Sequence, residues 1–380
     1  MILETDFGVC IGGFKAAGIK GGKHGVALIV SDRICDAVGV FTKNTVKAAP
    51  LLVTRKKLKN GIHAIIANSG NANACTKTGL RDAEEMCRVA AKSLRIDAKN
   101  VAVASTGIIG RPLNLEIIKN QVARISKNLG KTSKSAARAI MTTDTKPKQV
   151  SVEYKGIRIG GIAKGAGMIS PNMATMLCFL TTNADLRRGE LQKALKDAVE
   201  DNFNMLSVDN CMSTNDMVLL LSNKTKKCSA SDFRKALNFV TRKLAVMIAR
   251  DGEGSTKYVE VTVKGAKSKA EARKGAKAVV SSDLFKTMIY GKSANFGRIV
   301  SALGSVIKVD FKKMRIRFSS KKGSAVTFDN GRIGNLKKAV RILEDDEIFI
   351  DVNLRHGRES ATAFGCDLTE GYVRINARYS

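Results

Sequence analysis

The sequence predicts a mixed α/β fold, with strands and helices both distributed along the chain. Apolar runs rich in β-branched residues alternate with longer amphipathic stretches, and no segment repeats another. The chain has 380 residues, of which 44% are hydrophobic, and this is more than the core of one compact domain usually needs. We therefore expect two structural lobes.

The expected strands are short apolar runs, at residues 26–30, 64–67, 101–104 and 157–162. The expected helices carry apolar residues three and four positions apart, which gives each helix one apolar face. They are residues 81–94, 115–129, 190–203 and 231–250. Ser231 or Asp232 is the expected N-cap of the last helix, because a short side chain with an oxygen can accept from the free N–H groups of the first turn.

The chain is strongly basic, with 65 Lys and Arg against 34 Asp and Glu, a net charge of +31. Such an excess attracts polyanions, so nucleic acid is one candidate partner. However, aromatic residues make up only 5% of the chain, Trp is absent, and no aromatic-rich RNA-binding signature accompanies the basic residues. We expect a solvated basic surface rather than specific recognition of nucleic acid.

The cysteines and the N-terminus give no sign of metal binding or export. Eight cysteines are scattered without a C-x-x-C pair, and cysteine and histidine do not cluster at zinc-site spacing. No window reaches the roughly 18 apolar residues of a membrane span, and no basic flank with an apolar run opens the chain. Nucleotide-binding glycine motifs are also missing. We expect a cytoplasmic protein with reduced thiols, no cofactor, no bound metal and no membrane partner.

The segment from Lys164 to Leu177 (KGAGMISPNMATML) is the main candidate for chemistry, because its glycines and proline deliver Thr175 to the start of an apolar strand. Only three histidines exist, and none has the spacing of a hydrolase triad. If the Thr175 hydroxyl attacks the carbonyl of Ala174 and water releases the ester, Thr175 gains a free α-amine. Its pKa of about 7.7–8.0 suits a general base. The alternative is a threonine that only begins a buried strand.

Two further motifs could contribute to acyl transfer. Thr106 and Gly107 follow a strand in ASTGIIG, where a hydroxyl and a backbone N–H could face a developing oxyanion. The alternative is a turn that only ends the strand. Glu253 lies in the glycine turn RDGEG beyond a helix, where it could hold a substrate ammonium or be a solvated loop carboxylate.

At these motifs the sequence resembles the ornithine acetyltransferase family, also called the glutamate N-acetyltransferases of arginine biosynthesis. The match is nearly complete from Lys164 to Leu177 and extends along the chain. Further matching motifs are NSGNANACT at 68–76, MTTDTKPK at 141–148, SVDNCMSTND at 207–216 and the C-terminal stretch 364–376. Several ordered motifs with compatible spacing are far more specific than one.

The resemblance implies roles for individual residues. Thr175 would be the nucleophile, released by a cut between Ala174 and Thr175, and Thr106 with Gly107 would form the oxyanion hole. Lys164, Glu253 and Asn376 would contact the amino-acid substrate, as would either Thr142 or Thr143. The family carries a C-terminal hydroxyl one position further on, and three alternatives stay open here: Ser380 replaces it, the terminal carboxylate replaces it, or the contact is lost. A cation and an anion on opposite sides suit a substrate with an α-carboxylate and an amine.

The resemblance also implies a layered α/β sandwich made of an N-terminal segment, 1–174, and a C-terminal segment, 175–380. Two copies of each would form a heterotetramer. In the implied ping-pong reaction, N2-acetylornithine acetylates Thr175, ornithine leaves, and glutamate accepts the acetyl group. The sequence leaves open whether acetyl-CoA is also a donor.

Two departures from the family pattern bear on substrate choice. The family's DPNWGR reads SANFGR at 293–298, and Asn210-Cys211 replaces Gly-Asp. Two other functions stay open: a self-cleaving amide hydrolase that passes the acyl group to water, and a basic nucleic-acid-binding protein that has kept only the fold.

Overall fold

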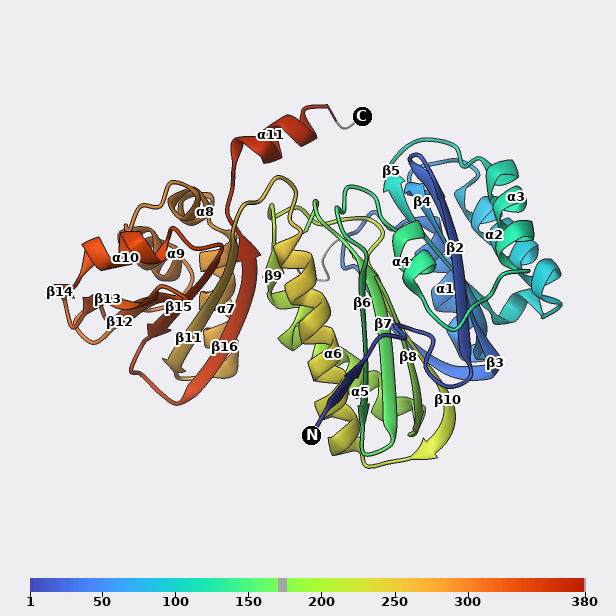
Figure 1. Cartoon of the computed structure of the whole chain (residues 1–380), viewed down its shortest axis with the longest axis horizontal. Helices are drawn as coiled ribbons and strands as arrows, with labels where there is room; N and C mark the ends of the chain where they lie inside the picture. Colours follow the sequence, from blue (N-terminus) through green and yellow to red (C-terminus); the bar gives the residue numbers. More distant parts are fainter. Residues whose placement is uncertain (170–175, 379–380) are drawn as a thin grey trace. The chain divides into compact units, whose positions relative to one another are not determined.

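The computed structural model describes residues 1–169 and 176–378 and divides them into two compact units. The first unit comprises residues 1–165, 176–203 and 211–248, and the second comprises residues 166–169, 204–210 and 249–378. Each unit has its own sheet (Figure 1). The expected two lobes and mixed α/β class are thus confirmed, although the chain passes between the units several times.

The sheet of the first unit has nine strands among the described residues, in the order β1-β6-β7-β8-β10-β3-β4-β5, with β2 beside β3. The strands are β1 (Leu3–Thr5), β2 (Phe14–Gly21), β3 (His24–Phe41), β4 (Ile62–Asn71), β5 (Val101–Ile108), β6 (Lys148–Tyr154), β7 (Ile157–Lys164), β8 (Leu177–Asp185) and β10 (Met217–Lys227). Strands β4 and β5 run parallel, as do β8 and β10, whereas β6, β7 and β8 form antiparallel pairs.

Strand β3 joins the two halves of this sheet (Figure 1). Its first part, residues 25–30, pairs with β2 and β4, and its last part, residues 36–41, pairs with β10. The register shifts between Val30 and Cys35, and a bulge of this kind bends a strand. One long strand therefore serves both halves.

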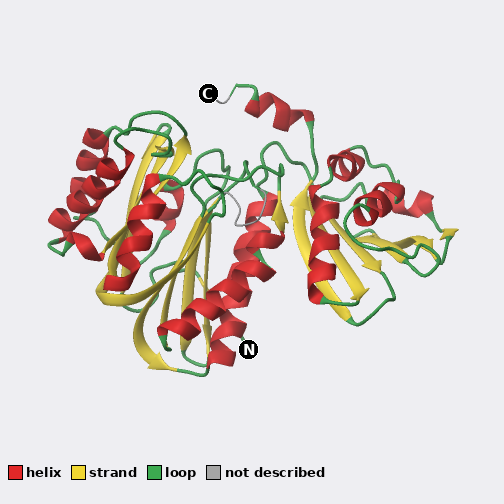
Figure 2. Cartoon of the chain, turned by 180° about the vertical axis from the view of Figure 1, so that it is seen from behind, coloured by secondary structure: helices red, strands yellow, loops and turns green. Residues whose placement is uncertain are grey.

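The helices of the first unit are α1 (Ala49–Lys57), α2 (Gly79–Leu94), α3 (Leu115–Ile125), α4 (Lys134–Ala139), α5 (Arg188–Asp201) and α6 (Ala230–Arg250). Alternation along β3 sorts them into layers, because successive side chains of a strand point to opposite faces. Val26 and Leu28 lie in an apolar cluster with α2 and α3, whereas Ala27 and Ile29 lie in a second cluster with α4 and strands β8 and β10. Helices and sheets therefore form layers (Figure 2).

The second unit has seven strands in its described part, in the order β14-β13-β12-β15-β11-β16-β9. They are β9 (Leu206–Ser207), β11 (Tyr258–Ala266), β12 (Arg315–Ser320), β13 (Gly323–Asp329), β14 (Arg332–Ile333), β15 (Glu347–Asn353) and β16 (Glu359–Cys366). The helices are α7 (Lys269–Ser281), α8 (Asp283–Tyr290), α9 (Gly297–Gly304), α10 (Leu336–Ile342) and α11 (Glu370–Asn376). Helix α7 buries Ala272, Ala276 and Val279 as it packs along β11 and β16. The short 3-10 helices are η1 (Leu58–Asn60), η2 (Ala98–Asn100) and η3 (Phe203–Met205).

The expected strands all lie inside longer observed strands, and the four expected helices are present. Helices α2 and α5 each begin two residues earlier than expected, and α5 ends two residues earlier, at Asp201. Two further details of the helix predictions were wrong. Helix α3 ends at Ile125 rather than at residue 129, because Gly130 exchanges two backbone hydrogen bonds with Ala16 of β2 and draws the chain away. Helix α6 begins at Ala230, and Ser229 rather than Ser231 or Asp232 caps it, since Ser229 Oγ accepts from the N–H of Asp232 at 3.1 Å.

Across residues 1–169 and 176–378, we find no helix whose length and hydropathy would let it cross a membrane.

Candidate active site

The predicted oxyanion-hole residues lie at the carboxyl end of β5. Thr106 pairs with Ser69 of β4 and is only 6% exposed, and Gly107 lies opposite Gly70. Gly107 has φ of +137°, and a Cβ there would lie 2.3 Å from the carbonyl carbon of Gly70. No side chain fits in that space, so glycine is required. The β4 register shifts at Gly70, and bulges of this kind re-aim groups beside active sites.

Asn215 holds this end of the sheet from the neighbouring loop. Its amide nitrogen donates to the carbonyl of Ala72 at 2.6 Å and to the carbonyl of Ser105 at 2.9 Å. Asn215 is 5% exposed, so these bonds form away from water. The residue lies in the STND motif, to which the sequence analysis assigned no role. Because Ser105 directly precedes Thr106, Asn215 fixes the backbone that presents the predicted oxyanion hole.

A buried carboxylate, Asp144, links two other predicted substrate contacts. Its Oδ2 accepts from the N–H of Thr142 at 3.0 Å, and its Oδ1 accepts from the N–H of Gly165 at 2.7 Å. Gly165 follows Lys164, the last residue of β7, which is 3% exposed. Thr143 is half-buried on the same turn as Thr142. The structure therefore brings the threonine turn and the end of β7 together through one side chain.

Lys148 completes this cluster. Its ammonium donates to Asp144 Oδ1 at 2.7 Å, and the two side chains are 1% and 0% exposed. Burial alone would raise the pKa of the Asp144 carboxyl, but the charges of Lys164 and Lys148 and the Gly165 N–H outweigh it and lower that pKa to about 2. Asp144 is therefore ionised, as a buried carboxyl can be when it is paired and hydrogen-bonded.

Lys20 connects the cluster to the oxyanion strand. Its ammonium donates to Ser69 Oγ at 2.8 Å and to the carbonyl of Met141, which directly precedes Thr142. Burial lowers the pKa of Lys20, the charge of Lys164 lowers it further, and Asp144 opposes both. Because Ser69 pairs with Thr106 in the sheet, Lys20 ties the predicted oxyanion hole to the threonine turn.

In the second unit, the structure brings Glu253 and Asn376 together. Asn376, at the end of α11, donates from Nδ2 to Glu253 Oε2 at 2.7 Å. The N–H of Glu253 donates to the carbonyl of Ala166 at 2.9 Å, and a Cβ on Gly167 would lie 2.2 Å from the Glu253 carboxyl carbon. The glycine of the KGAGM motif therefore lets the backbone pass directly against this carboxylate.

An aspartate accepts backbone hydrogen bonds on each side of the predicted cut, from the last described residues before it and from the first described residue after it. Asp209, in the second unit, accepts from the N–H of Met168 and, at 2.7 Å, from the N–H of Ile169. Asp216, in the first unit, accepts from the N–H of Met176 at 3.0 Å. Ala174, Thr175 and the C-terminal Ser380 lie outside the described residues, so the predicted nucleophile has anchored neighbours but no described geometry of its own.

Asp216 differs from Asp144 in its surroundings. It is 1% exposed, and its Oδ2 is buried without a hydrogen bond from the part of the chain that the structure describes. Burial raises the pKa of Asp216 well above its ordinary value, against the smaller opposing effects of the Met176 N–H and the charge of Lys164. Burial therefore disfavours the ionised form of the carboxyl that anchors Met176.

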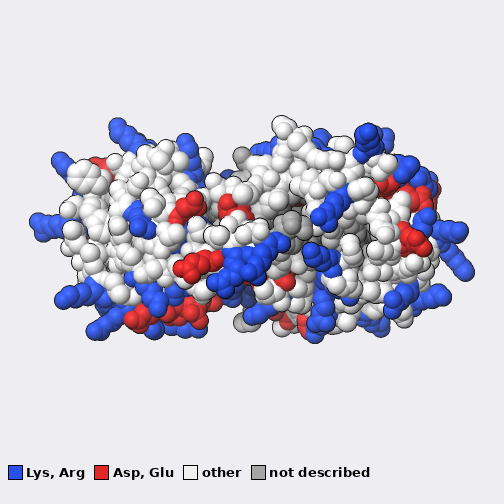
Figure 3. Space-filling view, turned by 90° about the horizontal axis from the view of Figure 1, so that it is seen from above, with Lys and Arg blue, Asp and Glu red and all other residues white. Residues whose placement is uncertain are grey.

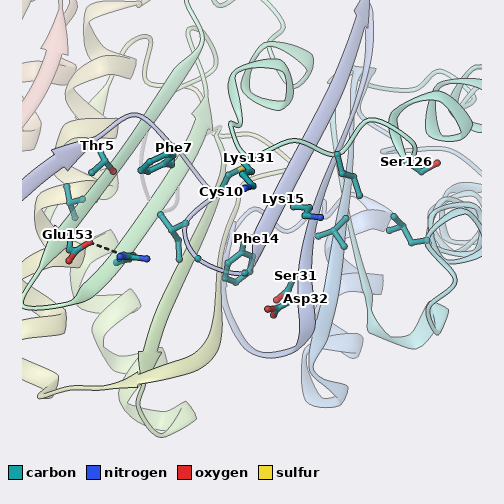
Figure 4. A pocket seen from close by; sticks show the side chains of 18 of the residues that line it. Thr5, Phe7, Cys10, Phe14, Lys15, Ser31, Asp32, Ser126, Lys131 and Glu153 are labelled. Atoms are coloured by element: carbon teal, nitrogen blue, oxygen red, sulfur yellow. Dashed lines mark hydrogen bonds and ion pairs between the residues drawn. The ribbon is translucent and has the colours of Figure 1, made fainter.

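A separate cavity of about 780 Å³ opens in the first unit beside the segment that leads into β2 (Figure 4). Cys10, Phe14, Lys131 and Glu153 are among its lining residues, and none of the predicted site residues is. Burial raises the pKa of the Cys10 thiol to about 12, so this thiol is not a nucleophile at neutral pH. The cavity is therefore distinct from the candidate active site.

The basic residues do not form one continuous patch on the face that Figure 3 shows. Lys and Arg side chains stand there in separate groups, with acidic side chains among them and broad uncharged areas between them.

The altered SANFGR motif has a structural role in the second unit. Asn295 Oδ1 accepts from the N–H of Gly297 at 3.1 Å, where α9 begins, and Arg298 donates from Nη1 to the carbonyl of Leu284 in α8 at 2.7 Å. Both contacts are made by residues that this chain shares with the family's DPNWGR pattern. The motif therefore joins α8 to α9.

Comparison with known proteins identifies the family. The ArgJ family model matches residues 12–380. A glutamate N-acetyltransferase of Methanocaldococcus jannaschii is 45% identical over 97% of both chains. The arginine biosynthesis bifunctional protein ArgJ 1 of Clostridium acetobutylicum is 44% identical over 96% of this chain and 94% of its own. A solved structure of the bifunctional protein ArgJ from Bacillus halodurans, 39% identical, covers 53% of this chain and 98% of its own, with a TM-score of 0.49. The chain therefore belongs to the ArgJ family.

Proposed function

We propose that this chain is a glutamate N-acetyltransferase of arginine biosynthesis. It transfers the acetyl group of N2-acetylornithine to glutamate and so forms ornithine and N-acetylglutamate. The observation that carries the proposal is the identity of 45% over 97% of both chains with a relative named for this activity. The cluster of Thr142 with the buried Asp144 and Lys164 supports it, because it places a cation at a polar edge of the sheet suited to a substrate carboxylate.

Thr175 is the proposed nucleophile and becomes available when the chain is cut after Ala174. Its hydroxyl oxygen attacks the carbonyl carbon of Ala174, the bond to the Thr175 nitrogen breaks, and that nitrogen takes the proton. Water then hydrolyses the resulting ester and leaves a free α-amine that activates the hydroxyl. The hydrogen bond from the Met176 N–H to Asp216 supports this assignment, because it anchors the residue that follows Thr175.

In the proposed ping-pong reaction, the Thr175 hydroxyl attacks the acetyl carbonyl of N2-acetylornithine. Thr106 and the Gly107 N–H stabilise the oxyanion, and the amine of ornithine leaves with the proton. Glutamate then attacks the acetyl-threonine through its α-amine. Donors aimed at an oxyanion work best when the backbone cannot relax, and the space around Gly107 leaves that backbone little freedom.

Substrate binding is proposed for residues of the motifs that match the family. Lys164 binds the α-carboxylate, with a further contact from Thr142 or Thr143. Glu253 binds the ammonium or amine side, oriented by the Asn376 amide at 2.7 Å, and Ser380 adds a C-terminal contact. A fixed carboxylate orientation is worth more to a small substrate than a freely rotating one, because less entropy is lost on binding.

After the cut, residues 1–174 and 175–380 are proposed to remain together and to pair into a cytoplasmic heterotetramer of two copies of each segment. Pairing of β7 with β8 supports the first part, because these strands lie on opposite sides of the cut. Strand β10 of the C-terminal segment also pairs with β3 of the N-terminal segment. The segments therefore share one sheet.

Mass spectrometry of the denatured protein tests the nucleophile. Wild type is expected to give fragments ending at Ala174 and beginning at Thr175, and Thr175→Ala is expected to give one intact chain. Thr225→Ala, which changes an exposed threonine of β10, is the matched control and should be cut normally. An uncut wild type would contradict the proposed maturation.

Acetyl transfer is then measured with the cut protein. N2-acetylornithine and glutamate should yield ornithine and N-acetylglutamate, and acetylated Thr175 should accumulate when glutamate is left out. Release of acetate at the same rate without glutamate would instead indicate a hydrolase. Replacing N2-acetylornithine by acetyl-CoA decides between recycling and bifunctional activity.

A further inference from the structure

Asp144 contacts three parts of the first unit: the turn at Thr142, the start of β6 at Lys148, and the end of β7 at Gly165. Its position follows from the pairing of β6 with β7. Lys148, the first residue of β6, pairs with Ala163 of β7 in the antiparallel ladder. Asp144 precedes Lys148 by four residues, so the turn before β6 lies beside the end of β7, where Lys164 and Gly165 follow Ala163. The position of Asp144 is thus a consequence of how β6 and β7 pair.

Both oxygens of Asp144 are used by different segments. Oδ2 accepts from the N–H of Thr142 at 3.0 Å, whereas Oδ1 accepts from the N–H of Gly165 and the ammonium of Lys148, each at 2.7 Å. The side chain is completely buried. One carboxylate therefore sets the distance between the turn that carries Thr142 and Thr143 and the backbone that carries Lys164.

We propose that Asp144 is a positioning residue for the transferase reaction, which holds the Thr142–Thr143 turn and the Lys164–Gly165 backbone at the separation that the substrate carboxylate requires. This inference rests on the proposed function, because it takes Lys164 and one of the two threonines as substrate contacts. Asp144 itself does not touch the substrate, and it acts through the groups that it holds.

The electrostatics point the same way. The charge of Lys164 helps to lower the pKa of the Asp144 carboxyl to about 2, so Asp144 is ionised. Before the substrate carboxylate binds, a nearby anion stabilises the charge of a buried ammonium. A buried cation without such an anion would destabilise the folded protein. Without Asp144, Lys164 and Lys148 would repel each other in a site shielded from water.

Asp144→Asn is the informative change, because it keeps the volume and removes the anion. All described hydrogen bonds to the two carboxylate oxygens come from N–H groups. An asparagine places an NH2 group where one of the oxygens was, so at least one backbone N–H or the Lys148 ammonium would face another donor. The separation of the two segments should then change by a few tenths of an ångström or more.

The test compares steady-state kinetics of cut wild type and cut Asp144→Asn with N2-acetylornithine and glutamate. Because the same contacts bind both substrates, KM is expected to rise about tenfold or more for each, as loss of a charge-assisted hydrogen bond does. Asp82→Asn is the matched control. Asp82 is also buried, with its side chain 4% exposed, but its described partners are Thr78 and Arg81 around the start of α2. Its KM values should stay within about twofold of wild type.

A purely structural role would give a different result. In that case both variants would lower the thermal midpoint, and Asp144→Asn would reduce the amount of active protein while leaving both KM values at wild type, which would overturn the proposal. If Asp144→Asn does not fold, Asp144→Glu replaces it, since the longer carboxylate keeps the charge but displaces the two N–H groups. A wild-type KM in Asp144→Glu would likewise overturn the proposal. Failure of the proposed function is seen separately, as absence of acetyl transfer in wild type.

Discussion

The end of the nine-stranded sheet and helix α11 both carry proposed substrate contacts, but in contrasting surroundings. At the sheet, Thr106 and Lys164 are 6% and 3% exposed, and Asp144 and Asn215 link them to the neighbouring segments. Helix α11 has seven residues and buries none of them. It is attached to its own unit by polar contacts, such as the bond from Thr369 Oγ1 to the carbonyl of Gly254 at 2.6 Å.

Substitutions in the two regions should therefore have different effects on stability and on substrate affinity. A change at the sheet disturbs packed backbone, so it should lower stability together with activity. A change on α11 removes a contact that water can partly replace, so it should alter substrate affinity and leave stability almost unchanged. Three substitutions test this contrast.

The largest effect is expected from Gly107→Ala. A Cβ at this position would lie 2.3 Å from the carbonyl carbon of Gly70, and φ of +137° already strains any residue but glycine. Denaturant unfolding should show a loss of about 2–4 kcal/mol. Gly110→Ala is the control, because Gly110 also has positive φ, +81°, but open space where its Cβ would be. It should lose only about 1–2 kcal/mol. Equal losses in the two variants would mean that the close approach to β4 does not matter.

An effect on stability that depends on pH is expected from Asp216→Asn. Burial raises the native pKa of Asp216 well above its ordinary value of 3.8. Below pH 3.8 the carboxyl is neutral in both the native and the unfolded state and leaves stability unchanged. As the pH rises, the unfolded state loses its proton first, so wild type loses stability until the native pKa is passed. Asparagine cannot ionise and avoids this loss.

Thermal unfolding from pH 4 to pH 8 measures the effect. The midpoint of Asp216→Asn should approach that of wild type at pH 4 and exceed it increasingly as the pH rises. If the variant is less stable than wild type by the same amount at every pH, the native pKa of Asp216 is not raised. The opposite pKa shifts inferred for Asp216 and Asp144 would then be wrong.

The smallest effect on stability is expected from Asn376→Ala. The variant loses the bond from Nδ2 to Glu253 Oε2 and should raise KM about threefold to tenfold, as loss of one hydrogen bond to a charged group does. Its free energy of unfolding should stay within about 0.5 kcal/mol of wild type. Arg374→Ala, on the same exposed helix, should change neither quantity. If Asn376→Ala lost as much stability as Gly107→Ala, the proposed difference between helix α11 and the end of the sheet would be wrong.

Much of this architecture follows from local sequence patterns. Apolar runs and amphipathic stretches predicted the elements because burial on one face is a local property. The end of α3 could not be predicted in the same way, since Gly130 leaves the helix to pair with Ala16, which is far away in the sequence. The N-cap of α6 was misplaced by two or three residues, because Ser229, Ser231 and Asp232 are all acceptable caps.

In the candidate site, too, some residues could be predicted from local sequence and others could not. Thr106, Gly107 and Glu253 lie in motifs whose glycines indicate that the backbone passes close to a neighbouring group. In the structure, Gly107 lies against the backbone of Gly70, and Gly167 lies against the Glu253 carboxylate. Asp144 and Asn215 lie in motifs that the sequence comparison includes, yet their roles depend on the pairing of β6 with β7 and on the loop before β10. The register between strands depends on both partners, so it cannot be predicted from the sequence of one segment alone.

Pairing of β7 with β8 and of β3 with β10 has a consequence for the refolding of a protein cut before Thr175. The new N-terminus would lead into an interior strand, and separating the fragments requires breaking both the β7–β8 ladder and the β3–β10 ladder. Once they have separated, refolding becomes a meeting of two molecules, and its yield falls with dilution. Cleavage would thus turn a protein that can refold by itself into one whose recovery depends on concentration.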